Sequence, residues 1–470
     1  MRKARLFAAI GLTALAAMSA ACSMAPAYAP PTVAVAPAFK ETGPWTPAAP
    51  EAEAQARGDW WTVYGDATLN DLEARAAKAN PSLASAAAAY DQARALATQA
   101  RGGLFPSIDG SATGIRQRRS DNAPLRNGGP DDYSTRQVGA TASYEVDLWG
   151  RVRNLVAASG AQAQASAADL ESVRLSLQAE LADDYLSLRG LDAQEKLLVD
   201  TADAYDKALR LTQIRHDGGA ATGLDVSRAQ TQLSTAKAQI SDIGAQRALY
   251  EHAIAALVGE SASSFNLPPA QIVFAQPRVP VGVPSTLLQR RPDIAAAERR
   301  AAAANAQIGV AQAARFPTLT LGGSAGWQSD GGVDLLASPN AFWMIAPQLA
   351  GSIFDGGRRK AGVEAARAQF DQAAAGYRGV VLAAFRNVED QLALANRLAD
   401  EAKDQDDAVG AAKRTETLAL IRYRQGAANY LEVVTAQTAS LQAERAALVL
   451  GTRRLQASVD LTRALGGGRG

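Results

Sequence analysis

The side chains that could perform covalent chemistry or bind a metal are few in this chain. Its 470 residues include one cysteine, Cys22, and two histidines, His216 and His252. Residues 322–326 (Gly-Gly-Ser-Ala-Gly) resemble a nucleophile elbow, but they lie inside a strand-like alternating pattern, and both histidines lie in distant helical patterns. One cysteine allows no disulfide framework, and these few residues make no cysteine–histidine zinc site. We therefore expect no catalytic residue, no metal site and no cofactor.

Two carboxylates occupy equivalent places in a motif that occurs twice. Residues 214–231 align without a gap on residues 421–438, and position 421 less position 214 gives an offset of 207 residues. Asp225 of the first copy corresponds to Glu432 of the second. In an assembly of identical chains such carboxylates could form rings that attract cations and constrict a pore. They could also cap the helices that begin there, because a carboxylate is favoured near a helix N-terminus, and the two roles are compatible.

The duplication extends over most of the chain. Residues 104–107 (Leu-Phe-Pro-Ser) return as residues 315–318 (Arg-Phe-Pro-Thr) at nearly the same offset. A repeat of this size is one structural unit and has to be interpreted before any smaller pattern. We therefore assign a first repeat to residues 61–270 and a second repeat to residues 271–470.

The chain begins with a secretory signal. Its first five residues carry three positive charges, and the apolar run over residues 6–21 that follows is too short to span a bilayer. Small residues precede Cys22, as in a lipoprotein processing box, so we expect residues 1–21 to be removed and Cys22 to carry a lipid anchor. A cut after Ala29, at Ala-Tyr-Ala, would instead discard Cys22. Residues 22–60 are rich in proline and alanine, which favours an extended tether.

The charge of the chain argues against nucleic acid as a partner. Lys and Arg number 48 and Asp and Glu 47, a formal net charge of +1, so there is no sequence-wide basic field. After the signal, no segment offers the roughly 18 consecutive apolar residues of a membrane helix. Any later membrane crossing would therefore have to be made of strands.

Two runs of about ten residues alternate between apolar and small or polar residues, the pattern and length of tilted membrane strands. In residues 137–148 the even positions are apolar, and residues 318–328 contain a second version. Residues 107–115 and 343–353 are weaker candidates that would pair with them as hairpins. Four strands cannot close a barrel, and an open edge in lipid leaves unpaired backbone groups. The sheet is therefore either an ordinary soluble antiparallel sheet or one third of a twelve-stranded barrel completed by three chains.

Each strand pair is followed by a helical segment of unusual length. Residues 151–216 and 358–424 contain no proline, and at 1.5 Å per residue each would span roughly 100 Å. Alanine dominates both segments and lets helix axes approach closely, which suits side-by-side packing into a wall. We also expect a helix over residues 293–314.

Each long helix ends at the duplicated motif. Gly218, Gly219 and Gly426 supply the backbone freedom of a helix C-terminus. Returning helices are expected over residues 224–258 and 431–465. The two motifs are therefore the turns of two long helical hairpins, at the end farthest from the strands.

Taken together, these features resemble the outer membrane factor family, the trimeric TolC- and OprM-like channels of tripartite efflux pumps, and in particular its lipoprotein branch. The resemblance covers nearly the whole mature chain. Its more specific stretches are residues 143–153 (Ser-Tyr-Glu-Val-Asp-Leu-Trp-Gly-Arg-Val-Arg), 288–298 (Leu-Gln-Arg-Arg-Pro-Asp-Ile-Ala-Ala-Ala-Glu), 308–317 (Ile-Gly-Val-Ala-Gln-Ala-Ala-Arg-Phe-Pro) and 353–358 (Ile-Phe-Asp-Gly-Gly-Arg).

The resemblance implies a mainly α protomer with a membrane β-barrel part. Three internally duplicated protomers, each with four β-strands and long antiparallel helical hairpins, would form a 12-stranded β-barrel in the outer membrane and a periplasmic α-helical barrel. The partners implied are two further copies of the chain, outer membrane lipids, a periplasmic adaptor protein and an inner-membrane transporter of the RND type.

The resemblance also implies roles for the residues at the hairpin tips. Leu224, Asp225, Leu431 and Glu432 would lie at or near a periplasmic gate, and the turn glycines Gly218, Gly219 and Gly426 would lie where an adaptor makes contact. Many relatives carry an aspartate where this chain has Thr435, so Asp225 or Glu432 would supply the carboxylate at that level. Ser23 after the cysteine is compatible with sorting to the outer membrane.

The function expected is that of a passive exit duct for small molecules such as drugs or other toxic compounds. Two alternatives remain open at this point. One is a TolC-like duct for secreted proteins. The other is a periplasmic adaptor lipoprotein, although an adaptor needs neither paired amphipathic strands nor duplication of the whole chain.

Overall fold

The structure is a computed structural model that describes residues 23–41, 58–122, 131–272, 274–277, 279, 290–330 and 334–468. The signal segment and Cys22 lie outside the described residues. The chain forms two compact units, the first made of Met1–Thr32, Ala89–Ala167 and Ala296–Arg378, and the second of Val33–Ala88, Ala168–Ala295 and Gly379–Gly470. Both sequence repeats contribute to both units, so the compact units do not coincide with the repeats.

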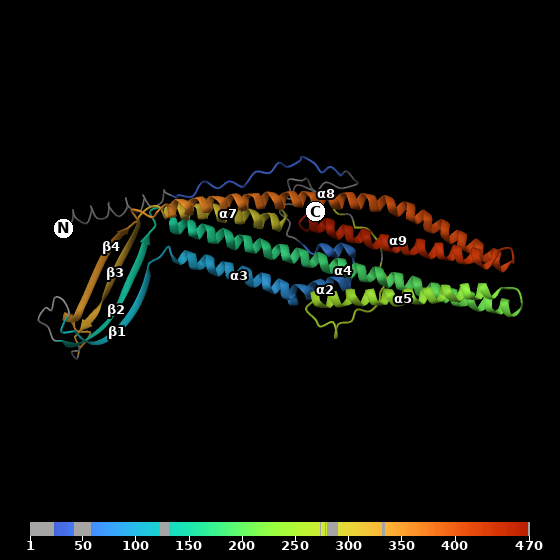
Figure 1. Ribbon diagram of the computed structural model, residues 1–470, viewed down its shortest axis with the longest axis horizontal. Coiled ribbons are helices and arrows are strands. Elements are labelled where there is room, and N and C mark those ends of the chain that lie inside the picture. Colours follow the sequence, from blue (N-terminus) through green and yellow to red (C-terminus); the bar gives the residue numbers. More distant parts are fainter. Residues whose placement is uncertain are drawn as a thin grey trace. The chain divides into compact units, whose positions relative to one another are not determined.

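The duplication is visible in the lengths of the helices (Figure 1). α3 (Pro81–Gly102) and α7 (Pro292–Ala313) have 22 residues each, α4 (Arg151–Asp217) and α8 (Arg358–Arg424) have 67 each, and α5 (Gly223–Leu257) and α9 (Tyr430–Ala464) have 35 each. In both repeats the long helix is followed by its returning helix. The chain therefore contains two helical hairpins of the same dimensions, and their ends fall within one residue of those expected from the sequence.

A short helical region precedes α3. The 3-10 helix η2 (Trp60–Tyr64) leads into α2 (Ala67–Ala79), and α3 starts directly after Asn80. The Asn80 side chain accepts hydrogen bonds from the backbone N–H groups of Ser82 and Leu83, at 2.9 and 3.0 Å. Proline at the first position of α3 needs no donor of its own, so the Asn-Pro pair ends one helix and starts the next.

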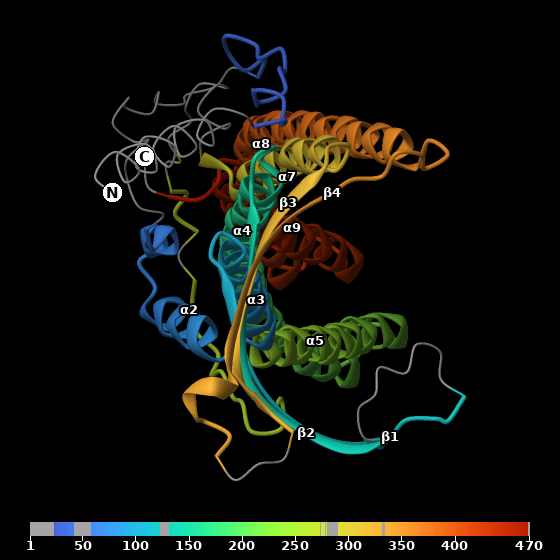
Figure 2. The same cartoon turned by 90° about the vertical axis from the view of Figure 1, so that its left-hand side faces the viewer.

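Four strands form one antiparallel sheet in the order β1-β2-β3-β4 (Figure 1). They are β1 (Ser107–Arg118), β2 (Asp132–Val146), β3 (Thr318–Ser329) and β4 (Ala341–Ala350). Figure 2 shows that the four strands curve together along their length. β2 and β3 come from different repeats, so the duplication joins two hairpins into a single sheet.

The strand ends differ from those expected. β1 ends at Arg118 instead of the expected residue 115, and β2 begins at Asp132 instead of the expected residue 137. The backbone ladder extends further, to a hydrogen bond from the Arg119 N–H to the Asp131 carbonyl at 2.7 Å. The side chains there are polar on both faces, so alternation stops while backbone pairing goes on. β2 and β4 end earlier than expected, at Val146 and Ala350, because the last pairs of the ladder are Val146 with Leu319 and Thr318 with Ala350.

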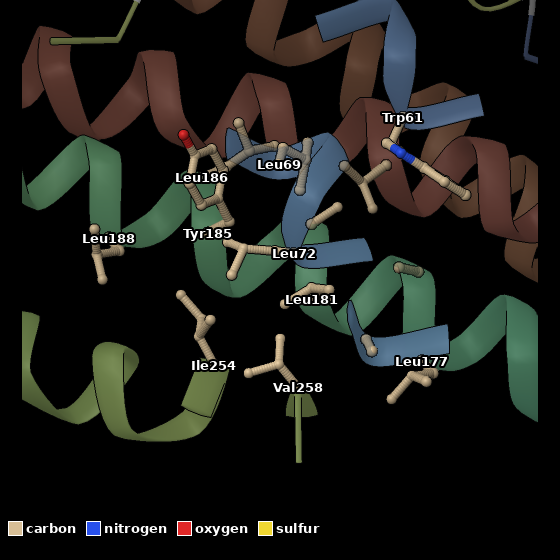
Figure 3. Close-up of a cluster of buried hydrophobic side chains, with 14 of the residues drawn as sticks. Trp61, Leu69, Leu72, Leu177, Leu181, Tyr185, Leu186, Leu188, Ile254 and Val258 are labelled. Carbon is tan, nitrogen blue, oxygen red and sulfur yellow. The ribbon is translucent and has the colours of Figure 1, made fainter. Parts of the chain in front are cut away.

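The core of the second unit lies where α2, α4, α5 and α9 meet (Figure 3). Leu69 and Leu72 of α2 pack on Leu181 and Tyr185 of α4, and Ile254 of α5 covers them from the other side. The Tyr185 hydroxyl donates to the Asp66 carboxylate at 2.6 Å. Since Asp66 also caps α2 through the N–H groups of its first turn, this bond fixes the orientation of α2 against the long helix.

The segment after Cys22, expected as an extended tether, contains no helix or strand over residues 23–41. It nevertheless makes specific contacts. In the first unit, the Tyr28 hydroxyl donates to Glu298 Oε1 at 2.6 Å, and Asn305 Nδ2 donates to the Pro26 carbonyl at 2.9 Å. In the second unit, the backbone N–H groups of Lys40 and Glu41 donate to the Glu389 carboxylate at 2.7 and 3.0 Å. The segment is therefore docked at both of these places.

Among the helices of the described part, none combines the length and the apolar composition needed to cross a bilayer.

Candidate functional site

The first hairpin turn is closed by a reciprocal cap. α4 ends at Asp217, and Gly219 adopts a left-handed conformation with φ of 76°. Thr222 is the N-cap of α5: its side chain accepts from the Asp225 N–H at 3.2 Å, and the Asp225 carboxylate accepts from the Thr222 N–H at 3.1 Å. This is a capping box, which satisfies two otherwise unpaired donors of the helix. The capping role expected for Asp225 is therefore confirmed, and its carboxylate is turned towards its own helix.

The second turn repeats this geometry with different side chains. Gly426 adopts φ of 78°, and Asn429 caps α9 by accepting from the Glu432 N–H at 3.1 Å. The Glu432 carboxylate does not return to the cap residue but pairs with Arg422 of α8, with Oε2 3.1 Å from Nη1. The carboxylates of the two equivalent positions thus have different partners.

The remaining tip residues lie where the sequence places them. Leu224 and Leu431 are the second residues of α5 and α9, and both side chains are exposed. The Gly218 N–H donates to the Ile214 carbonyl at 3.1 Å and so closes the last turn of α4. The geometry does not assign a gating or adaptor-binding role to any of these residues, and those roles stay predictions.

The structure brings the two turns together through Arg215, which the sequence did not single out. Its guanidinium donates to the carbonyls of Tyr423 and Arg424, at 3.1 and 3.2 Å, and lies 4.6 Å from the centre of the Tyr423 ring. These carbonyls lie at the C-terminus of α8, where a positive charge is favoured. The sequence did contain a signal, because Arg215 aligns with Arg422, the arginine at the same place in the second repeat.

Beneath this contact a small aromatic cluster joins the two hairpins. The ring centres of Tyr423 and Tyr430 lie 5.4 Å apart, and both side chains are buried with Ala229 and Val433. Burial, with smaller effects from the neighbouring Tyr423 and Asp225, raises the pKa of Tyr430 to about 12. Tyr430 therefore stays neutral at physiological pH, and this contact between the hairpins does not depend on pH in that range.

A buried ion network stiffens the first hairpin away from its tip. Asp192 accepts from Arg189 at 2.8 Å, from Arg247 at 2.7 Å and from the backbone N–H of Ala270 at 3.0 Å. Both Arg189 and Asp192 are almost fully buried. A buried carboxylate is tolerated only with such partners, so α4, α5 and the loop after α5 are tied together here.

Among the described residues, neither histidine is placed with other metal ligands or with a nucleophile. His216 lies in the last turn of α4 with Nδ1 3.0 Å from the Ala221 carbonyl, and His252 is exposed on α5. Residues 322–326 lie inside β3, as the alternating pattern indicated. In the described part of the chain, no group of three or more His, Cys, Asp and Glu side chains is placed to hold a metal ion.

The sheet has one apolar face and one face of mixed character, on which polar side chains alternate with Ile115, Phe342 and Met344. The register sets Ala140 opposite Ala325 and Ala325 opposite Trp343, and two residues further along sets Ala142 opposite Gly323 and Gly323 opposite Ile345. Positions between these rows carry polar side chains such as Thr141, paired with Ser324. On the apolar face the side chains of Trp343 and Ile345 are 77% and 74% exposed. Patches of this kind mark surfaces that contact a partner or a membrane.

Comparison with known proteins identifies one family. The sequence model of the family described as "Outer membrane efflux protein" matches residues 72–260 and 283–467. Outer membrane protein OprJ of Pseudomonas aeruginosa is 36% identical over 468 residues, covering 98% of this chain and 96% of that protein. The toluene efflux pump outer membrane protein TtgC of Pseudomonas putida is 32% identical over 463 residues, covering 98% and 95%.

A solved structure agrees with the sequence matches. The outer-membrane channel OprN superposes with a TM-score of 0.88 at 29% identity, covering 95% of this chain and 99% of that one. The mainly α fold with four strands and two long hairpins is therefore that of an outer-membrane channel. The same matches favour an efflux channel over both alternatives raised by the sequence, a duct for secreted proteins and a periplasmic adaptor.

Proposed function

Because this chain belongs to the outer membrane efflux protein family and is an outer-membrane efflux channel, we propose that three copies of it form the passive exit duct of a tripartite pump. The family is one of channels rather than enzymes, and the duct would perform no covalent chemistry and need no cofactor. Its work would be to conduct solutes delivered by an inner-membrane transporter and a periplasmic adaptor.

The observation that carries the trimer is the sheet with two open edges. Within the described part of the chain, β1 pairs only with β2, and β4 only with β3. An unpaired strand edge in hydrocarbon costs several kcal/mol for each unsatisfied backbone group, so four strands with an exposed apolar face are not stable alone in lipid. Pairing β1 of one copy with β4 of the next removes both edges. Two copies would give an eight-stranded barrel, whose interior side chains can fill, so three copies give the smallest wider barrel that four-stranded chains can build.

The trimer is tested by the native mass of the mature protein extracted by detergent from purified outer membranes. A mass of three chains, together with single-channel conductance in planar bilayers, is the expected result. A monomer, or recovery of the protein in the inner membrane, contradicts the shared barrel.

The lipid anchor at Cys22 is part of the same proposal. Removal of residues 1–21 keeps Ser23, whose hydroxyl donates to Asn154 Oδ1 at 2.9 Å, and Tyr28, which bonds to Glu298. A cut after Ala29 would discard both contacts, so the docked segment supports acylation of Cys22. Mass spectrometry of the N-terminal peptide tests this, since a mature chain that starts at Pro30 is incompatible with an anchor on Cys22.

We also propose that the hairpin tips form the periplasmic gate, with Leu224, Asp225, Leu431 and Glu432 at the constriction and the turn glycines facing the adaptor. Exposed leucines beside capped helix starts support this, because they are available to meet other hairpins across a closing ring. Leu431→Ala and Asp225→Ala are expected to raise basal conductance in planar bilayers, with Leu249→Ala, an exposed leucine of α5 away from the tip, as control. Conductance unchanged by both tip variants removes these residues from the gate.

The cargo is proposed to be small toxic compounds, and the transporter to be of the RND type. The relative TtgC is described as belonging to a toluene efflux pump, which supports apolar small molecules as a class. Expression with a known adaptor and transporter in a host lacking its own channel tests this. Restored tolerance to toluene and to drugs is expected, and no restoration with any RND partner pair counts against this assignment.

A further inference from the structure

The outer end of the β1–β2 hairpin carries a row of arginines that the channel function does not use. Arg116 and Arg118 lie on β1, and Arg136 lies on β2. Arg116 and Arg118 have side chains 79% and 71% exposed, and Arg136 is exposed as well. Side chains at alternate positions of a strand share a face, so the face to which each arginine belongs follows from the register.

The register places all three arginines on the apolar face of the sheet. Ala112 is paired with Val138, and Val138 is paired with Trp327, which fixes the last apolar row. Arg136 is two residues beyond Val138 on the same face, and Arg116 and Arg118 are four and six residues beyond Ala112. The arginines therefore continue the surface that would face lipid, at the end of β1 farther along the strand from α3.

Their spacing matches the headgroup layer of a membrane. A strand rises about 3.3 Å per residue, and a tilt of roughly 40° reduces this to about 2.5 Å of height. Arg136 would lie about 5 Å and Arg116 about 10 Å above the row of Trp327, an aromatic residue of the kind that marks the membrane interface. The polar layer of each leaflet is roughly 5–8 Å thick, so Arg136 lies within it. Arg116 and Arg118 start above it, and their long side chains would have to bend back along the strand to bring the guanidinium groups to its phosphates.

The carboxylates that pair with Arg116 and Arg118 in the described part of the chain hold them only weakly. Asp132 Oδ2 is 3.5 Å from Arg116 Nη2, and Asp121 Oδ2 is 4.0 Å from Arg118 Nη2. Both pairs are long and exposed, and such pairs hold their partners weakly. A phosphate offers more charge and suits the planar fork of a guanidinium.

We propose that Arg116, Arg118 and Arg136 bind the phosphate groups of an anionic lipid in the outer leaflet. This inference rests on the proposed function, because it needs the apolar face to lie in the membrane with the hairpin tips outward. It assigns a lipid class to one hairpin. The described ends of the β3–β4 connection carry Asp330 and Asp334 instead, so a trimer would hold three such sites rather than a continuous ring.

The test compares the triple variant Arg116→Gln/Arg118→Gln/Arg136→Gln with the wild-type trimer, both in detergent. The probe is lipid A bearing two phosphates, and the readout is the rise in Tm that it causes. Basic residues near an anionic surface contribute about 1 kcal/mol each, so the triple variant should need roughly a hundredfold more lipid for the same rise in Tm. Arg136→Gln alone should need about fivefold more, which keeps the test valid if the triple variant folds poorly.

Two controls separate this site from general charge effects. Arg119 lies on the polar face of the same hairpin, with its guanidinium 5.4 Å from the centre of the Tyr133 ring, and Arg119→Gln should bind lipid A as the wild type does. Arg94→Gln/Arg386→Gln/Arg397→Gln removes the same number of exposed helical charges, each paired with a nearby carboxylate at 3.5–3.9 Å. It should also bind normally.

Other probes decide the chemistry. Lipid A without phosphates and inorganic pyrophosphate should give no stabilisation at the same concentrations. The inference is overturned if lipid A without phosphates or pyrophosphate stabilises the wild type as much as phosphorylated lipid A does. It is also overturned if phosphorylated lipid A stabilises the triple variant as much as the wild type. A wild-type protein that is monomeric before lipid is added refutes the proposed function instead, whereas a conducting trimer that ignores phosphorylated lipid refutes only this site.

Discussion

Removing Arg215 should loosen the contact between the two hairpin turns. Arg215→Ala deletes two charge-assisted hydrogen bonds to the C-terminal carbonyls of α8 and one cation–π contact with Tyr423. The equivalent change in the other repeat, Arg422→Ala, deletes the pair with Glu432, in which both side chains are exposed, and a 3.3 Å hydrogen bond to the Ala427 carbonyl of its own turn. The same amino acid at the same place in two repeats thus makes contacts of different strength.

The magnitude follows from these contacts. Each hydrogen bond contributes roughly 0.5–1 kcal/mol at a half-buried site, and the cation–π contact contributes about 0.5–1 kcal/mol. Arg215→Ala should therefore lower the free energy of local opening at the tips by about 2 kcal/mol, a change of roughly thirtyfold in the opening equilibrium. Arg422→Ala removes one exposed ion pair and one exposed hydrogen bond within its own turn, together worth at most about 1 kcal/mol, or roughly fivefold.

Hydrogen exchange measures this directly, because the amides in the second turns of α5 and α9 are hydrogen-bonded within their helices and exchange when the tips open. We expect about thirtyfold faster exchange for Arg215→Ala and at most about fivefold for Arg422→Ala. Arg210→Ala, which removes only an ion pair with Asp206 inside α4, should change the exchange rate by no more than about twofold. Equal exchange rates in Arg215→Ala and Arg422→Ala would refute the argument that Arg215 joins the hairpins.

Three further predictions concern the buried groups of the helical hairpins and of α2, and the packing of the sheet. Asp192→Ala leaves Arg189 and Arg247 without their shared carboxylate and should lower the free energy of unfolding by about 3–5 kcal/mol in denaturant melts, whereas Asp200→Ala, in an exposed pair, should change it by less than about 0.5 kcal/mol. Gly326→Ala places a Cβ against the Val138 carbonyl and should sharply reduce the yield of outer-membrane trimer, whereas Gly110→Ala, with no atom within 4 Å of its Cβ, should assemble normally. Burial raises the pKa of Glu73 to about 9 from 4.5, so folding takes up a proton and stability falls as the pH rises between these values. At about 1.4 kcal/mol per pH unit, Glu73→Gln should gain about 4 kcal/mol over the wild type between pH 5 and pH 8, and parallel pH profiles would show that the carboxyl is not protonated in the fold.

Much of the fold could be predicted because its signals are periodic and occur twice. The long helices α4 and α8 contain no proline and end at glycines, so their bounds differ from the expected ones by no more than a residue. The outer ends of β1 and β2 were missed because polar side chains on both faces erase the alternation that marks a strand. Backbone pairing needs no particular side chain, so the ladder continues where the sequence signal stops.

The tips were predicted only in part, for a different physical reason. The caps at Asp225 and near Glu432 depend on residues three apart, which a sequence displays directly. The contact of Arg215 with Tyr423 joins residues 208 apart, and no local pattern reports such a distance. The docking of Tyr28 on Glu298, 270 residues away, is of the same kind and was not expected of a proline-rich tether.

The repeats differ most where their lengths are least constrained. The three corresponding helix pairs, α3 with α7, α4 with α8 and α5 with α9, have equal lengths, whereas β2 has 15 residues and β4 has 10. Rods packed side by side must end at the same level, since an unmatched turn would leave its apolar face and its terminal carbonyls without partners. A hairpin that projects beyond a membrane can lengthen without disturbing the pairs below it. In a duplicated chain, selection for a closed helical wall would keep the corresponding helices equal in length. The strand hairpins, which are free to vary at the outer rim, would become unequal.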